Sequence, residues 1–286
     1  MITSATLGGL PVIYNSDDEV PPCVSFVVPL FNVSPQILLE SLESVMNQSF
    51  RDFECIIVDE STDGRSSDVC LDFCRRDSRF RYIQPAVRIG LAASLNLGIS
   101  LARASLVARF DADDICMNDR LSIQVAFMSQ HSEVGVLGGS LEIIDNQGNT
   151  LAFRRYPSND SAIQKKMQFT TPLAHPTVIV RREVFNRCGT YDTAFRNAED
   201  LDLWLRLSNC DVIFANLPDV LVRYRQQFTR RPFRHLQFNL KARLRNFHSK
   251  HVGRRILGIC LIFFWCAVPP SLQEQIFRRL MLRKVA

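Results

Sequence analysis

The sequence predicts an α/β protein in which helices flank a mainly parallel sheet. Short apolar runs such as residues 24–29 and 55–58 alternate with segments whose apolar residues recur at helical spacing, an order typical of β-α-β units. The chain has 286 residues, of which 47% are hydrophobic and 22% charged, a composition typical of globular rather than disordered or fibrous proteins. Its length suits one large domain with an appended segment.

The elements of the first half follow one another in regular alternation. After the first strand, Ser34 is a cap residue and Pro35 takes the first helical position. This helix breaks near Asn47, and the expected elements after it are a strand at 55–58, a helix at 66–77, a strand at 81–83, a helix at 91–102 and a strand at 106–110. Asp59 and Asp111 each follow a strand, where parallel sheets bind ligands. We therefore expect the two acids to share a site.

The second half has a mixed pattern. A helix is expected from about Asn118, and the segments 134–144 and 150–155 flank a turn sequence, so they predict a hairpin. A strand at 177–180, a helix at 199–207 and two short strands at 212–215 and 220–223 complete the expected elements.

The first 22 residues are expected to form a loose leader. They lack the basic start and apolar run of a signal peptide, and they contain Asp17, Asp18 and Glu19, which oppose export. Nine cysteines form no Cys-x-x-Cys pair, which favours reduced thiols over a zinc ribbon or a disulfide framework. Both observations predict a cytoplasmic protein.

The last 61 residues, 226–286, are expected to form a basic, aromatic, helical tail. From Arg223 to the end, fifteen Lys or Arg residues accompany a single acid, Glu274, and apolar residues recur among them at helical spacing. This pattern fits anionic lipid headgroups of the inner membrane better than nucleic acid.

Residues 256–268 are the most apolar run of the tail. Thirteen helical residues reach only about 20 Å against a hydrocarbon core of about 30 Å, so the run is too short to cross a bilayer. Two interpretations stay open, a buried C-terminal helix and a segment in the membrane interface. The flanking arginines favour the second, and they are Arg254, Arg255, Arg278 and Arg279.

An acidic turn (residues 111–114) carries three carboxylates, those of Asp111, Asp113 and Asp114. Mg²⁺ or Mn²⁺ accepts a few carboxylate oxygens and completes its shell with substrate phosphates. Such a metal would offset the charge of a departing diphosphate. Taken alone, an acidic turn is more often a solvated cap.

An ordered series of motifs resembles the family 2 glycosyltransferases. It begins with Pro29-Leu-Phe-Asn32 and continues through residues 47–50, 53–59, 90–98, 108–114, 119–120, 138–139, 174–177 and 198–206. Because the series spans residues 23–225 in order, it is more specific than any single motif. The resemblance implies an A-type glycosyltransferase fold, with Asp59 binding the base and with Asp111 and Asp113 binding ribose and the metal-diphosphate.

The resemblance also implies a catalytic base. Glu199 and Asp200 open a helix, where acids are also good caps. By family likeness, Asp200 accepts the proton of the acceptor hydroxyl as it attacks the anomeric carbon, and Glu199 assists. Direct displacement would invert the anomeric configuration without a covalent intermediate.

Further residues are expected to contact the substrate. Arg88, Arg109 and Arg120 could pair with diphosphate oxygens, although surface charge is the usual role of arginine. His175 is more often a hydrogen-bonded structural residue at such a position. Trp204 could stack on a sugar, but its spacing among leucines favours a role in the core. The expected substrate contacts are Pro29, Phe31, Asn32, Asp59, Arg88, Gly90, Asn96, Arg109, Asp111, His175 and Trp204.

Two departures from the family pattern qualify this reading. The usual Asp-Asp-Gly-Ser-Thr-Asp loop is here Asp59-Glu-Ser-Thr-Asp63, which leaves the base contacts open. Residues 227–231 match only part of the Gln-x-x-Arg-Trp motif of processive members, so transfer of a single sugar is expected.

The leading hypothesis is transfer of one hexose or N-acetylhexosamine, from a UDP-sugar first of all, to a glycan acceptor. The acceptor would be lipid-linked, in the synthesis of surface polysaccharide, lipopolysaccharide or exopolysaccharide. Alternatives are a catalytically degenerate partner subunit and a nucleic-acid-binding protein that uses the basic tail. A sugar-phosphate nucleotidyltransferase is disfavoured because no N-terminal Gly-rich phosphate loop is present.

Overall fold

The computed structural model describes residues 2–7, 10–15, 20–226 and 233–268. In that part of the chain, eleven strands form one mixed sheet. The strands are β1 (Ile2–Leu7), β2 (Leu10–Asn15), β3 (Val24–Leu30), β4 (Phe53–Asp59), β5 (Phe80–Ile83), β6 (Leu106–Arg109), β7 (Ile115–Cys116), β8 (Val134–Ile144), β9 (Thr150–Arg154), β10 (Ile179–Arg181) and β11 (Ile213–Arg225). The helices are α1 (Pro35–Met46), α2 (Ser67–Arg76), α3 (Leu91–Leu101), α4 (Arg120–Gln130), α5 (Asp160–Met167), α6 (Arg182–Cys188), α7 (Glu199–Asn209), α8 (Phe233–Arg245) and α9 (Val252–Ala267), and η1 (His175–Thr177) is a 3-10 turn.

The centre of the sheet is parallel and its flanks are mixed. The order is β1-β2-β5-β4-β3-β6-β10-β8-β11-β7, with β9 beside β8. Strands β5, β4, β3 and β6 run parallel, and β8 runs parallel to β11. The remaining pairings are antiparallel, and among them β10 enters between β6 and β8 in the opposite direction to both. The α/β fold with flanking helices is therefore confirmed, and the sheet contains more antiparallel pairing than the sequence suggested.

The first residues of the chain belong to the sheet. β1 pairs with β2 in a register that sets Leu7 opposite Leu10, and β2 pairs with β5. The expectation of a loose leader is wrong for these two segments. The sequence contains a local signal for this pairing, since a Gly-Gly dipeptide between two apolar runs is typical of hairpins. The leader's residues 1, 8–9 and 16–19 lie outside the described residues.

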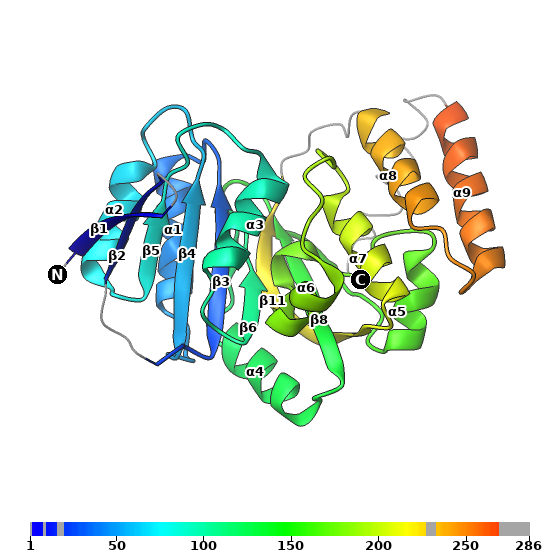
Figure 1. The fold of residues 1–286 in the computed structure, drawn as a ribbon, viewed down its shortest axis with the longest axis horizontal. Coiled ribbons are helices and arrows are strands. Elements are labelled where there is room, and N and C mark those ends of the chain that lie inside the picture. The colour runs from blue at the N-terminus through cyan, green and yellow to red at the C-terminus, as the bar shows by residue number, and fades with distance from the viewer. Residues whose placement is uncertain (1, 8–9, 16–19, 227–232, 269–286) are drawn as a thin grey trace.

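Helices cover both faces of the sheet because alternate strand residues point to opposite sides. Phe26 and Val28 of β3 pack with α1, α2 and α4, whereas Val27 packs with α3, α6 and α7. Figure 1 shows α1 and α2 on one face and α3 and α6 on the other. The central strands are therefore buried on both sides, which explains their uninterrupted apolar sequences.

Strand β11 brings distant residues to the acidic turn. It pairs with β8 along its length and with β7 at Val222 and Arg223. The sequence predicted two short strands here, and the structure has one strand whose register shifts between Asn216 and Val220. Pro218, which has no backbone N–H, lies in that interruption. The carboxyl end of β11 thus lies beside β7, which directly follows the acidic turn.

Helices α8 and α9 lie beyond α7, at the end of the molecule away from β1 (Figure 1). Within the described ranges, no helix is long and apolar enough to cross a membrane. Residues 227–232 and 269–286 of the expected tail, including the partial processive motif and Arg278 and Arg279, lie outside the described residues.

Candidate functional site

The acidic turn concentrates negative charge at the end of β6. Burial, followed by the charge of Asp111, raises the pKa of Asp113 to about 6. Burial and both neighbouring acids raise the pKa of Asp114 well above its usual value. Asp114 accepts a hydrogen bond from the main-chain N–H of Arg225 through Oδ1, at 2.8 Å, whereas its Oδ2 has no hydrogen-bond partner among the described residues. The nearby arginines therefore do not fully neutralise the negative charge of the turn.

The guanidinium of Arg109 is bonded to this turn and interacts electrostatically with a second group of acids. Its side chain is almost buried, and its Nη1 donates a hydrogen bond to Oδ2 of Asp111. Burial disfavours the charged guanidinium, yet the Asp111 carboxylate raises the pKa of Arg109 above its usual value. Its Nε has no hydrogen-bond partner in the described part of the chain. A fixed cation with an unused donor therefore borders the acidic turn.

The second group of acids is at the start of α7. Ala198, just before the helix, adopts a left-handed backbone with φ of 59°, a conformation that is uncommon outside glycine and is found at functional sites. Burial, then the charge of Asp200, raises the pKa of Glu199 to about 7, and Asp111 acts in the same direction. Oδ1 of Asp200 accepts a bond from the N–H of Leu201. The two groups of acids thus lie within electrostatic range of each other.

Tyr191 joins these acids and was not predicted from the sequence. Its hydroxyl is 2.8 Å from Nε2 of His175, and the charges of Arg109, Glu199, Asp200 and Asp111 all act on it. Burial, followed by the charge of Arg109, lowers the pKa of His175 well below its usual value, so the ring is neutral. No motif surrounds Tyr191, which follows Gly189-Thr190 in a loop. Only the fold reveals its place.

Asn96 and Trp204 serve the framework of this site. The side chain of Asn96 donates to the carbonyl of Tyr191 at 2.8 Å and accepts from its N–H at 2.9 Å. Both polar ends of the amide are thereby used within the protein. Trp204 is fully buried and packs edge-on against His175 and Phe214. The expectation that Trp204 stacks on a sugar is therefore wrong, because no part of its ring is exposed.

The loop after β4 forms a second part of the site. Asp59 is 1% exposed, and its oxygens accept hydrogen bonds from the N–H of Ser61 at 2.9 Å and from the hydroxyls of Ser66 at 3.2 Å and Tyr82 at 2.9 Å. The side chain that sequence reasoning assigned to the base therefore also holds its own loop. Pro29 precedes the end of β3, buried, in register with Val58.

Glu60, which departs from the family pattern, fixes the neighbouring turn. Its Oε2 accepts hydrogen bonds from the N–H groups of Ile89, at 2.9 Å, and Gly90, at 2.7 Å. Gly90 has φ of 88°, which strains any residue with a side chain, and it caps α3. The departure in sequence thus has a defined structural role.

Phe31, Asn32 and Arg88 lie at the surface of this loop cluster. The guanidinium of Arg88 stacks over the ring of Phe31, with 3.9 Å between its carbon and the ring centroid. Asn32, at φ of 50°, accepts from the N–H of Thr62 at 3.0 Å and thereby joins the two loops. Five sequence-predicted residues, Phe31, Asn32, Asp59, Arg88 and Gly90, are therefore brought together at the ends of β3 and β4. Arg120 is instead fully buried, with Nη2 donating to the carbonyl of Arg109.

The residues fit a divalent cation that arrives with a diphosphate. Among the described residues there is no cluster of three or more His, Cys, Asp or Glu side chains that could hold a metal ion. Mg²⁺ and Mn²⁺ need fewer, because one or two carboxylates plus phosphates and water complete their shell. Asp111 and Asp113 are such a pair, and the unpaired Asp114 Oδ2 and Arg109 Nε suit the cation and the phosphate respectively.

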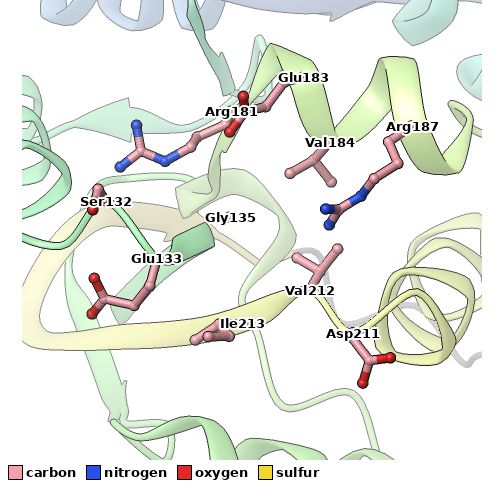
Figure 2. Close-up of a pocket in the computed structure, with 10 residues that line it drawn as sticks. All are labelled: Ser132, Glu133, Gly135, Arg181, Glu183, Val184, Arg187, Asp211, Val212 and Ile213. Carbon is pink, nitrogen blue, oxygen red and sulfur yellow. The ribbon is translucent and has the colours of Figure 1, made fainter.

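A pocket of about 390 Å³ lies elsewhere, at the amino ends of β8 and β11 (Figure 2). Its lining mixes Glu133, Glu183 and Asp211 with Arg181 and Arg187. Because β8 and β11 run parallel and their carboxyl ends approach the acidic turn, this pocket is at the opposite edge of the sheet. None of the sequence-predicted site residues lines it.

Comparison with known proteins identifies the family and the fold. The model of the family described as glycosyl transferase family 2 matches residues 25–189. The O-antigen biosynthesis glycosyltransferase WbnJ of Escherichia coli is 30% identical over 193 residues, which cover 65% of this chain and 72% of WbnJ.

Solved structures share the fold. S. aureus TarS 1-349 in complex with UDP-GlcNAc superposes with a TM-score of 0.64 at 17% identity, over 90% of this chain and 75% of that one. The mannosyltransferase PcManGT from Pyrobaculum calidifontis, in complex with GDP-Man and Mn²⁺, gives 0.62 at 17% identity, over 95% and 84%. This chain spans 43% of a longer TarS structure. At such identities the likeness establishes the A-type glycosyltransferase fold. The family match over residues 25–189 shows that this chain belongs to glycosyl transferase family 2.

Proposed function

We propose that this chain transfers one sugar from a nucleotide-sugar donor to a glycan acceptor, with inversion at the anomeric carbon. The observation that carries the proposal is the approach of two acidic groups around one arginine. The acidic turn and the start of α7 come from opposite halves of the chain, and Arg109 interacts with both Asp111 and Glu199. One group of acids would hold the metal that accompanies the diphosphate, and the other would take the proton of the acceptor hydroxyl.

The donor is assigned to the loop cluster at the ends of β3 and β4. The stacked pair of Phe31 and Arg88 offers an aromatic face and a guanidinium, which suit a base and a phosphate respectively. Asp59 and Asn32 hold the loops on which that pair stands. TarS binds UDP-GlcNAc and PcManGT binds GDP-Man, and a UDP-hexose or UDP-N-acetylhexosamine is the first donor to test.

The diphosphate is assigned to the acidic turn and Arg109. Asp113 and Asp111 would hold Mn²⁺ or Mg²⁺ together with the phosphates, and the ion would offset the charge of the leaving nucleoside diphosphate. Arg109 would donate its unused Nε to a phosphate oxygen, since it is already fixed by Asp111. Because Arg109 and the metal would be held in place before the reaction, they would not need to move as charge develops on the diphosphate.

The acceptor is assigned to the start of α7. Asp200 takes the proton of the acceptor hydroxyl while the hydroxyl oxygen forms its bond to the anomeric carbon and the bond to the diphosphate breaks. The pKa of Glu199 is raised to about 7, so near neutral pH Glu199 and Asp200 titrate as a coupled pair. His175 is neutral and, with Tyr191, offers polar atoms beside these acids.

The biological setting follows from the relatives. WbnJ is named for O-antigen biosynthesis, which supports a lipid-linked glycan acceptor in the synthesis of lipopolysaccharide or another surface polysaccharide. Residues 23–225 would be the catalytic domain, and residues 226–286 a basic tail that works at the cytoplasmic face of the inner membrane.

The proposal is tested by nucleotide release from a panel of UDP-, GDP- and dTDP-sugars, with and without Mn²⁺ or Mg²⁺. Asp113→Ala should abolish the metal-dependent release, and Asp200→Asn should abolish transfer to an acceptor. Asp219→Asn, at an exposed position in the interrupted part of β11, is the matched control and should leave both intact.

Two results would contradict the proposal. No release and no binding with any donor would instead favour a degenerate partner subunit. Salt-dependent retention on DNA, in the absence of turnover, would favour nucleic-acid binding through the tail.

A further inference from the structure

Helix α9 carries an apolar surface that the rest of the described chain leaves uncovered. We define the α9 outer face as Ile256, Leu257, Leu261, Phe263 and Phe264, which are between 51% and 74% exposed. The opposite side of the same helix is occupied, because Arg255 and Gly258 are buried there. A helix that is apolar all round is normally covered on all sides. The outer face therefore lacks a partner among the residues that the structure describes.

The inner side of α9 holds the helix firmly to the catalytic domain. Arg255 donates to the carbonyl of Asn246 and to Oδ1 of Asn209, and Asn246 in turn donates to Oδ1 of Asp202 at 2.8 Å. Asp202 belongs to α7 and is fully buried. At Gly258 a Cβ would approach the carbonyl oxygen of Gln168 to 2.0 Å, so the helix packs there as closely as only glycine permits. The orientation of the outer face is thus fixed by α7 and by the end of α5.

The surrounding charge indicates what the outer face meets. Arg254 is exposed at the start of α9, and from Arg223 onward the sequence has fifteen Lys or Arg residues and one acid, Glu274. Six of the fifteen are buried or ion-paired within the protein, so the charge available to a partner rests on the other nine; the six are Arg223, Arg225, Arg243, Arg245, Lys250 and Arg255. The whole chain has a net charge of only +5, so the positive charge is concentrated in this segment. Two copies of such a segment would repel each other, which disfavours a dimer through this face. An anionic lipid bilayer has an apolar core and negatively charged headgroups, so it matches both the apolar face and the positive charge.

We propose that the α9 outer face docks on an anionic lipid bilayer, with α9 lying in the plane of the headgroups. Its sixteen residues give about 24 Å of helix, too little to cross a hydrocarbon core of about 30 Å. Phe263 and Phe264 enter the acyl region, and the exposed Arg254 at the start of α9 contacts the headgroups. Docking itself is independent of the reaction, whereas its purpose, presenting the site to a lipid-linked acceptor, rests on the proposed function.

The first experiment measures sedimentation of the full chain with vesicles. Vesicles of phosphatidylcholine alone are compared with vesicles that contain roughly one third phosphatidylglycerol. We expect binding to the anionic vesicles, weakened when the ionic strength rises from about 0.1 M to about 0.5 M. In the variant Phe263→Ser/Phe264→Ser the partition coefficient should fall at least about tenfold, since two large apolar side chains no longer enter the bilayer.

The matched control replaces exposed apolar residues elsewhere. Leu151→Ser/Phe153→Ser changes two such side chains on β9, which pairs with β8 outside the tail, and should bind vesicles as the wild type does. All three proteins should unfold at similar temperatures and release nucleotide from a soluble donor at similar rates. Equal unfolding temperatures and equal release rates would show that a loss of vesicle binding is caused neither by misfolding nor by a damaged active site.

The second experiment uses the tryptophans. The chain has two, Trp204 and Trp265. Trp204 is fully buried in the core, whereas Trp265 lies on α9 beside Phe264 in sequence. Vesicles with brominated acyl chains should quench part of the fluorescence, and Trp265→Phe should remove that quenching while vesicle binding persists.

Three results would overturn the proposal. The first is absence of binding to anionic vesicles at low salt, and the second is equal binding by Phe263→Ser/Phe264→Ser. The third is a dimer that this variant converts to monomers, which would assign the outer face to a second copy. Vesicle binding by a protein that hydrolyses no donor would uphold docking and refute the proposed transferase activity, so the two failures are distinguishable.

Discussion

Arg225 holds the main chain of Asp113 from a strand in the other half of the protein. Its Nε donates to the carbonyl oxygen of Asp113 at 3.0 Å, and its own N–H donates to Oδ1 of Asp114 at 2.8 Å. The same guanidinium reaches the carbonyls of Asp145 and Asn146 and, at 2.6 Å, Oε2 of Glu40. One side chain thereby ties the acidic turn to the β8–β9 hairpin and to α1.

Replacing Arg225 by lysine should displace the acidic turn while it preserves the charge. An ammonium group cannot reproduce this set of directed bonds, and a shift of about 1 Å in a catalytic group can lower a rate by roughly a hundredfold. We expect donor turnover to fall by about tenfold or more, with a higher Mn²⁺ concentration needed for half-maximal rate. Arg223→Lys is the control, because Arg223 lies in the same strand but bonds to Glu142 and to the carbonyl of Gly148. Equal effects of the two substitutions would refute a positioning role for Arg225.

Removing the carboxylate of Asp113 should stabilise the protein at alkaline pH while it abolishes the metal response. The pKa of this acid is raised to about 6 in the folded protein, above its unfolded value of about 3.9. Stability from the protonated form is thus fully present below about pH 4 and is lost as the pH rises through about 6. Asp113→Asn should therefore raise the free energy of unfolding at pH 8 by about 1–2 kcal/mol, a value reduced for partial exposure, and have little effect at pH 4. Urea unfolding at both pH values measures this, and a loss of stability at pH 8 would contradict it.

The rate of transfer should rise with pH through about 7, and Glu199 should set the position of that rise. Burial and the charge of Asp200 raise the pKa of Glu199 to about 7, so the pair holds a proton near neutrality. In Glu199→Gln the like charge beside Asp200 is gone, and the ascending limb of kcat/KM should move to lower pH by about one unit or more. Glu133→Gln, at the opposite edge of the sheet, should leave the limb in place. An unmoved limb in Glu199→Gln would assign the rise to another group.

Two tyrosine hydroxyls should contribute unequally to stability. Tyr82 donates to the carboxylate of Asp59, whereas Tyr191 is bonded to a neutral His175. A hydrogen bond to a charged group contributes roughly 1.5–3 kcal/mol and a neutral one roughly 1 kcal/mol. Tyr82→Phe should therefore lower the free energy of unfolding by more than Tyr191→Phe does. Urea titrations of the two variants give the comparison, and the reverse order would contradict the assigned partners.

The sequence predicted those features that depend on neighbouring residues. The strands before Asp59 and Asp111 were recognisable because buried parallel strands are continuous apolar runs, and their shared edge then placed both acids in one region. The helix at Glu199 was marked by its apolar spacing. The sequence did not predict Arg225 or Tyr191, since their partners are distant in the chain and neither lies in a recognisable motif. The pairing of β1 with β2 was not predicted, because β5, the strand that joins them to the rest of the sheet, is distant in the chain.

Trp204 illustrates a different limit. Its spacing among leucines favoured the core but did not exclude contact with a sugar, and the packing of His175 and Phe214 around the ring establishes the core role. Asn96 is similar, since the residues next to it in the sequence do not indicate that both ends of its amide bond to the main chain of Tyr191.

The bonds made by Glu60 bear on how this protein could be engineered. A designer guided by the family average would write aspartate at this position, because the usual loop carries two consecutive aspartates. Here the carboxylate reaches the N–H groups of Ile89 and Gly90, and an aspartate would be one methylene shorter. The averaged residue would release the turn that starts α3, so at this position the unusual residue is the one to keep.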